Sequence, residues 1–555
     1  MKNFFFLLGL LLISFSTQAS AAPTELEGTF KLGPTLIMIF VLILFILIGL
    51  KYRAKDTSDY YAAGRKISRI GSGMAIASNW MSAASFLGMA ALMFGLGYHG
   101  LAFVAGWTGG YVLLLILMAG QIRKYGKYTA PDFIGDRYYS TGLRLASAII
   151  VIFISIAYTV PQFAGIGLMF KWIMGIDYFY ALLIGGGVVL IYTLISGMLG
   201  VTKNMQVQYI IIAISFLIPL FVLLYDYNYF FLLPPVGYGS VVSDIVTGIP
   251  LAEANYLMNV HGHQFAIVAS PEYVMPWSTS TGVSFFQWMA IIFSLMIGTA
   301  GLPHVIQRFY VVPKSNDARW SVVWGLFFIC IIYWTAPVYA AFGKILAAHP
   351  EVGRLAPDAI VIYTAQLGNV HPLIVGFLAA GAVSAAFSTT AGLLVSGASA
   401  FSHDIYVRVM NPNAEGKKQL LIARVGTVLM AVIVAMLAML ELALIGELVA
   451  LTFSIAGSTI FPLFLLGIWW SGSNKQGAIA GLAVGVAISI FAITYFVAGR
   501  LGTVLPHHEF VSYYLGAWYF GWVGAPLAII TNILVSRFTK PTPIEIRKFL
   551  AEQVH

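Results

Sequence analysis

Thirteen apolar stretches recur along the chain, and each is long enough to cross a lipid bilayer. A helix needs ~20 residues to span ~30 Å of hydrocarbon. Charged residues make up 9% of the chain, against roughly 25% in soluble proteins, so a soluble globule is excluded. We therefore predict an all-α polytopic membrane protein. The expected spans are residues 33–50, 71–97, 101–122, 143–170, 178–197, 206–226, 283–303, 320–343, 372–401, 421–440, 445–469, 476–498 and 513–536.

Residues 1–22 have the pattern of a signal peptide. Lys2 precedes a largely apolar run from Phe4 to Phe15, and small residues follow up to Ala22. The apolar run is too short for a membrane span, although an uncleaved first span is the alternative. We expect cleavage near Ala21 or Ala22, which would leave the mature N-terminus outside the cytoplasm.

Basic residues are distributed unevenly between the two sides of the predicted membrane. With the spans above, 24 of the 30 Lys and Arg fall on one side and 5 on the other. Because Lys and Arg mark cytoplasmic loops, the C-terminal tail 537–555 is predicted to be cytoplasmic, in a cell inner membrane. The net charge of +9 thus reflects topology rather than binding to nucleic acid. The loop 227–282 is predicted to lie outside the cell membrane. It either caps the external opening of the helix bundle or serves as a passive linker.

Two of the predicted spans carry small hydroxyl side chains in their middle, between glycines. Hydroxyl and carbonyl oxygens suit a hard monovalent cation such as Na⁺. No group there titrates near neutral pH, so these segments are unsuited to relaying protons. Tight helix packing is the alternative explanation. The polar residues are Ser78, Asn79, Ser82 and Ser85 in span 71–97, and Ser384, Ser388, Thr389 and Thr390 in span 372–401.

Other polar residues lie inside predicted spans. Tyr158 and Gln162 are four residues apart and share a helix face. An interhelical hydrogen bond would explain Gln162 equally well. Glu447 begins a span and fits either the outer interface or a proton site. The sequence shows no nucleophile–base pair, metal cluster or phosphate loop, so we do not expect an enzyme.

Four short motifs follow one another along the chain. They are Asp59-Tyr-Tyr-Ala-Ala-Gly-Arg65, Thr129-Ala-Pro-Asp-Phe-Ile-Gly-Asp-Arg137, Gly301-Leu-Pro-His-Val-Ile-Gln-Arg308 and Ser402-His-Asp-Ile-Tyr406. Together they resemble signatures of the sodium:solute symporter family. The run Met81–Gly88, together with Gly298-Thr-Ala-Gly-Leu-Pro-His304, is most similar to the acetate/monocarboxylate permease branch. The signal peptide is also similar to that branch.

This resemblance implies a LeuT-type core of two inverted repeats of five helices each. The first repeat would cover residues 71–226 and the second 283–469. The first helix of each repeat, 71–97 and 283–303, would be broken within the membrane. The helices 33–50, 476–498 and 513–536 would be peripheral.

The resemblance also implies the positions of two binding sites. The Na⁺ ligands would be backbone carbonyls of Ser78, Met81 and Ala385 and the hydroxyls of Ser388 and Thr389. The substrate pocket would lie beside them, formed by Ser82, Ala83, Ser85, Tyr158, Gln162, Leu295 and Thr299. A small carboxylate would be held by free backbone N–H groups and hydroxyls, without an arginine.

Differences from other branches of the family narrow the range of expected substrates. Proline-transporting relatives have aromatic residues where this chain has Leu295 and Thr299, and sugar-transporting relatives have Gln in place of Ser85. Some relatives with a second sodium site have Asp where this chain has Met205, which favours one Na⁺ per substrate. The implied function is Na⁺-coupled import of a small monocarboxylate such as acetate by alternating access.

Three alternatives remain open. The first is a Na⁺-coupled symporter of another solute, such as an amino acid or a sugar. The second is a membrane sensor with a transporter fold, which the short segment after the last span disfavours. The third is proton coupling, for which Glu447 is the candidate. The oligomeric state is left open.

Overall fold

The computed structural model describes residues 30–248, 259–260, 263–264, 269–277, 283–346, 357–440, 445–500, 509–516 and 518–555. The predicted signal peptide, residues 1–22, lies outside the described residues. Helices dominate the fold, and the described strands form one antiparallel pair that joins Val260 to His263. The elements are α2 (Leu32–Lys51), α3 (Thr57–Ala62), η2 (Ala63–Arg65), α4 (Arg69–Trp80), η3 (Ala84–Gly88), α5 (Met89–Leu96), η4 (Gly97–Gly100), α6 (Leu101–Leu117), α7 (Ala119–Tyr125), α8 (Ala130–Arg137), α9 (Thr141–Met174), α10 (Tyr178–Asp226), α11 (Pro234–Thr247), β1 (Asn259–Val260), β2 (His263–Gln264), η6 (Pro271–Val274), α12 (Phe285–Gly301), α13 (Pro303–Ile306), η7 (Gln307–Val311), α14 (Ser315–Tyr333), α15 (Ala336–Leu346), η8 (Pro357–Ala359), α16 (Ile360–Leu367), α17 (Pro372–Ser399), η9 (Ala400–Met410), α18 (Gly416–Ala438), α19 (Ile445–Trp469), α20 (Lys475–Arg500), α21 (Glu509–Tyr514), α22 (Gly521–Phe538), α23 (Ile544–Phe549) and η10 (Leu550–Val554).

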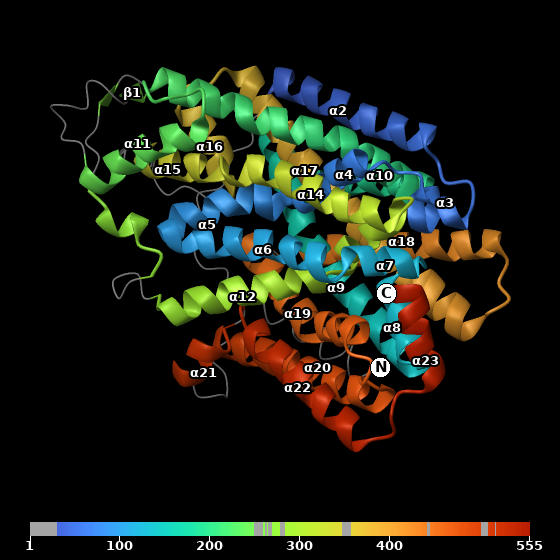
Figure 1. Ribbon diagram of the computed structural model, residues 1–555. Helices are drawn as coiled ribbons and strands as arrows, with labels where there is room; N and C mark the ends of the chain where they lie inside the picture. Colours follow the sequence, from blue (N-terminus) through green and yellow to red (C-terminus); the bar gives the residue numbers. More distant parts are fainter. Residues whose placement is uncertain are drawn as a thin grey trace.

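The long helices run side by side as one bundle, with α17 and α19 in its interior (Figure 1). Both interior helices are buried on all sides and carry no charged residue along most of their length, the pattern of a helix enclosed by other helices. The outer helices α2 and α18 instead expose large apolar side chains such as Phe40 and Met436. In a membrane these side chains would face lipid, so the bundle has the surface expected of a polytopic membrane protein.

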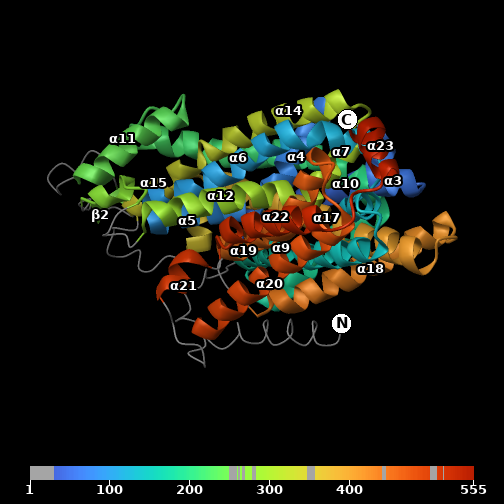
Figure 2. The same ribbon diagram turned by 60° about the horizontal axis from the view of Figure 1, so that its bottom comes forward.

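The segments rich in Lys and Arg gather at one end of the bundle. Helices α3, α8 and α23 lie at this end, and α11 with the β1–β2 pair lies at the opposite end (Figures 1 and 2). This arrangement agrees with the predicted charge asymmetry. The assignment of the basic end to the cytoplasm stays a prediction from the sequence.

Ten helical stretches of the described chain are long and apolar enough to cross a membrane, or eleven if one bent pair counts as a span. The predicted number of thirteen spans is therefore not confirmed. Two of the ten stretches contain a glycine with positive φ, Gly97 at 55° and Gly197 at 53°. The stretch around Gly197 has 49 residues, or roughly 74 Å at 1.5 Å per residue, more than twice the hydrocarbon thickness. One helical stretch can thus hold two of the predicted spans.

The close approach of α12 and α19 depends on glycine. A Cβ atom added to Gly298 would lie 2.4 Å from the backbone oxygen of Phe453. Because backbone atoms cannot swing away, G298A should force the two helices apart and lower stability by ~1–3 kcal/mol. The midpoint of thermal unfolding of the purified protein in detergent measures this change.

Gly187 in α10 provides the matched control, because a Cβ atom there would meet no atom within 4 Å. G187A should leave the unfolding midpoint unchanged or raise it slightly, since alanine favours the helix. An unfolding midpoint for G298A equal to that of G187A would contradict the close contact.

Candidate functional site

Helix α4 ends in the middle of the bundle. The helix begins where the Ser68 hydroxyl accepts a hydrogen bond from the Gly71 amide, and it ends at Trp80. Met81 then leaves the helical conformation, with φ −70° and ψ 70°, and the chain resumes as the π-helical turn η3. An interruption of this kind frees backbone N–H and C=O groups, which must be satisfied by protein, ion or substrate.

Two hydroxyls of α17 contact the carbonyl oxygens freed at the end of α4. Ser388 Oγ donates to the Ser78 oxygen at 2.5 Å and also lies 2.8 Å from the Ala385 oxygen. Thr389 Oγ1 donates to the Asn79 oxygen at 2.8 Å and lies 3.4 Å from the Ala385 oxygen. All of these residues are buried. The contacts therefore concentrate hydroxyl and carbonyl oxygens between two helices.

Four of the five residues predicted to bind Na⁺ are joined by these contacts. They are Ser78, Ala385, Ser388 and Thr389. Among the contacts of the described residues, the two hydroxyls reach Ser78 and Asn79 rather than Met81. Asn79 was predicted as a polar residue of the span but not as a Na⁺ ligand.

Helix α9 lies on the other side of the interruption. Gln162 Oε1 accepts a hydrogen bond from the free Ala83 amide at 2.8 Å. The Tyr158 side chain lies within interaction range of the Ser82 side chain. Gln162 is thus an interhelical hydrogen-bonding residue, and its partner is a backbone group released by the break. The structure brings these four predicted pocket residues together.

Ser85 connects the interrupted segment to helix α14. Ser85 Oγ donates to the Trp80 oxygen at 3.0 Å and lies 3.0 Å from the Tyr333 hydroxyl. Tyr333 was not predicted as a site residue, because nothing in its local sequence distinguishes it from other aromatic residues of α14.

Helix α12 is the second interrupted helix. It begins with a capping box formed by Ser284 and Gln287 and ends at Gly301. Leu302 is extended, with ψ 122°, because it precedes Pro303. The segment Pro303–Val311 then continues at an angle of 51° to α12. The predicted breaks within 71–97 and 283–303 therefore both exist as interruptions of helical structure.

The other two predicted pocket residues, Leu295 and Thr299, pack against α6. A Cβ atom at Gly110 would lie 2.2 Å from Thr299 Cβ, and one at Gly106 would lie 2.7 Å from Leu295 Cβ. Thr299 Oγ1 donates to the Leu295 oxygen at 2.7 Å, within its own helix. Their place in the substrate pocket stays a prediction.

Two residues after the α12 break were missed as site candidates. Both belong to the motif Gly301–Arg308, and neither was predicted to bind an ion or a substrate. In the structure each is 1% exposed. The signal was present in the motif Gly301–Arg308, where a histidine and an arginine directly follow a predicted intramembrane break.

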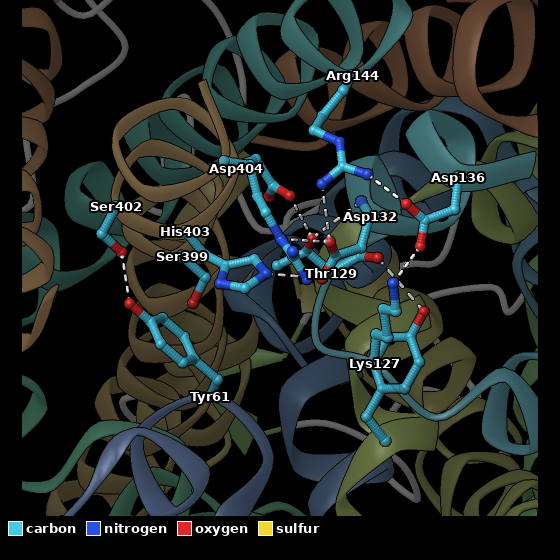
Figure 3. A network of polar contacts seen from close by, with 12 residues as sticks. Tyr61, Lys127, Thr129, Asp132, Asp136, Arg144, Ser399, Ser402, His403 and Asp404 are labelled. Atoms are coloured by element: carbon cyan, nitrogen blue, oxygen red, sulfur yellow. Dashed lines mark hydrogen bonds and ion pairs between the residues drawn. The ribbon is translucent and has the colours of Figure 1, made fainter. Parts of the chain in front are cut away.

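A separate polar cluster lies at the basic end of the bundle, where α8 meets η9 (Figure 3). Asp132 Oδ2 lies 2.8 Å from His403 Nε2, and Asp132 Oδ1 lies 3.2 Å from Arg144 Nη1 and 3.6 Å from Arg408 Nε. Thr129 Oγ1 donates to Asp404 Oδ1 at 2.9 Å. The cluster thus ties the loop helix α8 to the end of the span that carries Ser388 and Thr389.

The Asp132 carboxylate already has basic partners within this cluster. Asp132, His403 and Asp404 could offer ligand atoms within 4.8 Å of one another, but Arg144 already occupies an oxygen of Asp132. Burial acts to raise the pKa of Asp132. The hydrogen bond and charge of His403 and the charges of Arg144 and Arg408 outweigh burial and hold that pKa below its ordinary value. The ion pairs of this cluster therefore join α8 to α9 and η9.

The paired helix interruptions in a membrane bundle define a secondary transporter rather than an enzyme. The sodium:solute symporter family model matches residues 60–485. The chain belongs to this family, which supports Na⁺-coupled symport of a small solute across a lipid bilayer.

Two further comparisons cover nearly the whole chain. An uncharacterized symporter from Cupriavidus necator is 27% identical over 624 residues, covering 90% of this chain and 91% of that protein. The substrate-bound outward-open structure of a Na⁺-coupled sialic acid symporter matches with a TM-score of 0.71 and 16% identity, covering 93% of this chain and all of the other. The second comparison shows that the two proteins share a fold.

Proposed function

We propose that this protein is a Na⁺-coupled symporter that imports a small monocarboxylate, such as acetate, by alternating access. The observation that carries the proposal is the contact of Ser388 and Thr389 with the backbone oxygens at the end of α4. Each hydroxyl lies 310 positions along the chain from the residue whose backbone oxygen it contacts. An ion held between them would link the two helices.

The proposed Na⁺ ligands are oxygens of Ser78, Met81, Ala385, Ser388 and Thr389. Hydroxyl and carbonyl oxygens without a carboxylate suit a monovalent cation, and a single charge can be held there without a fixed counter-ion. The proposed pocket lies on the α9 side of the break, with Ser82, Ala83, Ser85, Tyr158, Gln162, Leu295 and Thr299. Ion and substrate would thus bind next to each other at the interruption of one helix.

The acetate/monocarboxylate assignment rests on the run Met81–Gly88 and the segment Gly298–His304, which resemble that branch of the family. One Na⁺ would accompany one monocarboxylate, so the net charge moved would be zero. The membrane potential, which contributes ~2.3 kcal/mol per charge per 100 mV, would then add nothing to uptake. The Na⁺ gradient alone would drive transport, in an inner membrane with the C-terminus in the cytoplasm.

Uptake of radiolabelled acetate into proteoliposomes tests the proposal. We expect uptake under an inward Na⁺ gradient and none under a pH gradient alone. An imposed membrane potential should leave the initial rate unchanged. A panel of unlabelled monocarboxylates, amino acids and sugars should compete in that order of strength. Uptake driven only by the pH gradient would contradict Na⁺ coupling and redirect attention to Glu447.

A further inference from the structure

We infer that His304 and Arg308 recognise the anionic group of the substrate, and that the charge of Arg308 couples anion binding to Na⁺ binding. This inference deepens the proposed function and rests on it. It also differs from the expectation, drawn from the sequence, that a carboxylate would be held without an arginine. Both residues follow the break between α12 and α13.

Arg308 is a buried cation with neutral neighbours. Its Nη1 donates to Thr202 Oγ1 at 3.1 Å, and its Nη2 donates to Asn79 Oδ1 at 3.5 Å. The structure records no ion pair between Arg308 and a carboxylate within the described part of the chain, and Arg308 Nε has no hydrogen-bond partner there. A buried charge without a counter-ion is expensive. An anionic ligand would supply the missing counter-charge.

His304 extends the same group of donors toward the predicted pocket. Its two ring nitrogens are buried and have no partner among the described residues. Its ring meets that of Tyr158 edge-on, with centroids 5.3 Å apart. Asn79 Nδ2 is also buried and without a partner in the described structure. His304 therefore contacts the predicted pocket residue Tyr158, and Arg308 contacts Asn79 at the end of α4.

Arg308 also lies beside the proposed Na⁺ site. A Cβ atom on Gly392 of α17 would lie 2.1 Å from Asn79 Oδ1 and 2.9 Å from Arg308 Nη2. Gly392 is one helical turn after Ser388, and Asn79 contacts both Arg308 and Thr389. The guanidinium and the ligand hydroxyls thus pack around the same residue, Asn79.

This placement gives a physical mechanism for coupling. The positive charge of Arg308 opposes Na⁺ binding nearby, because like charges repel strongly in a low-dielectric interior. An anion paired with Arg308 cancels that repulsion, so each ligand should tighten the binding of the other by the same factor. The pair His304 and Arg308 would therefore favour anions over neutral solutes of similar shape.

Two measurements on the full-length protein test the inference. One is the KM for Na⁺-driven uptake of radiolabelled acetate, with acetamide as an uncharged competitor. The other is the binding of radiolabelled Na⁺ with and without acetate. For the wild type we expect acetate to tighten Na⁺ binding and acetamide to compete poorly. The variants are R308Q, R308K and H304Q.

In R308Q the KM for acetate should rise about tenfold to a hundredfold, as expected for loss of a hydrogen bond to a charged group. Acetate should no longer tighten Na⁺ binding, while Na⁺ binding without acetate should be unchanged or stronger. A purely structural role for Arg308 would instead weaken Na⁺ binding. R308K keeps the charge, so it should keep the coupling but bind acetate more weakly. H304Q should raise the KM for acetate and retain the effect of acetate on Na⁺ binding.

R137Q and H99Q are matched controls. Arg137 is buried and donates to the backbone oxygens of Gly467 and Trp470, and His99 is buried beside the Pro276 oxygen. Both controls should keep the wild-type KM and coupling.

Wild-type values in R308Q and H304Q would overturn the inference while leaving the proposed function standing. If R308Q fails to fold, loss of coupling in R308K or an unchanged KM in H304Q would overturn it. A wild type that binds Na⁺ but transports no monocarboxylate would overturn the proposed function, and the inference with it.

Discussion

Replacing Ser388 with alanine should raise the Na⁺ concentration for half-maximal uptake about tenfold to a hundredfold, the effect of losing one hydrogen-bonding group to a charge. The double variant S388A/T389A should abolish Na⁺-dependent uptake. The reason is that both hydroxyls reach oxygens at the end of α4, so their loss removes two ligands and both contacts between the helices. Uptake rates at varied Na⁺ concentration measure the change.

Ser384 provides the matched control on the same helix. Its hydroxyl is equally buried, but it donates to the Ala380 oxygen of its own helix at 2.8 Å. S384A should keep the wild-type Na⁺ dependence, and T389S, which retains the hydroxyl, should do so as well. If S388A and S384A have the same Na⁺ dependence, the Na⁺ site lies elsewhere.

Replacing Asp132 with asparagine should destabilise the protein by ~3–5 kcal/mol, the usual result of removing one partner of a buried ion pair. Asp132 is fully buried and faces His403, Arg144 and Arg408. Without its carboxylate, the positive charges around it lose their counter-ion. The midpoint of thermal unfolding measures the loss.

The pH dependence of this effect follows from the lowered pKa of Asp132. A carboxyl group with a lowered folded-state pKa contributes stability that is present above its ordinary pKa of 3.8 and lost as the pH falls through the folded value. The unfolding midpoints of the wild type and D132N should therefore differ fully at neutral pH and converge below pH 3.8. A constant difference across that range would show that the carboxylate charge is not responsible.

Asp136 is the comparison for D132N. It lies one helical turn further along the same segment, bonds Lys127 and Arg144, and its side chain is 24% exposed. Solvent screens exposed ion pairs, so each contributes only ~0–1 kcal/mol to the stability of the fold. D136N should therefore lower the unfolding midpoint much less than D132N does.

Much of the architecture could be predicted from the sequence because it depends on local composition. Runs of apolar residues identify membrane helices, and the bias of Lys and Arg toward one end agrees with the positions of α3, α8 and α23. The interruptions within 71–97 and 283–303 were expected from the resemblance of the sequence motifs to the symporter family. Each of these signals lies within a few residues of the feature that it predicts.

Tertiary structure decided which groups from distant segments meet. The sequence pointed to the hydroxyls of Ser388 and Thr389, but only the packing of α17 against α4 assigned the Asn79 oxygen to Thr389. Likewise, Arg308 has the sequence context of a cytoplasmic loop residue, and it is buried because α4, α10 and α17 enclose the turn after the break. Burial depends on neighbours hundreds of residues away, so local composition determined the helices of this protein, and helix packing determined its candidate site.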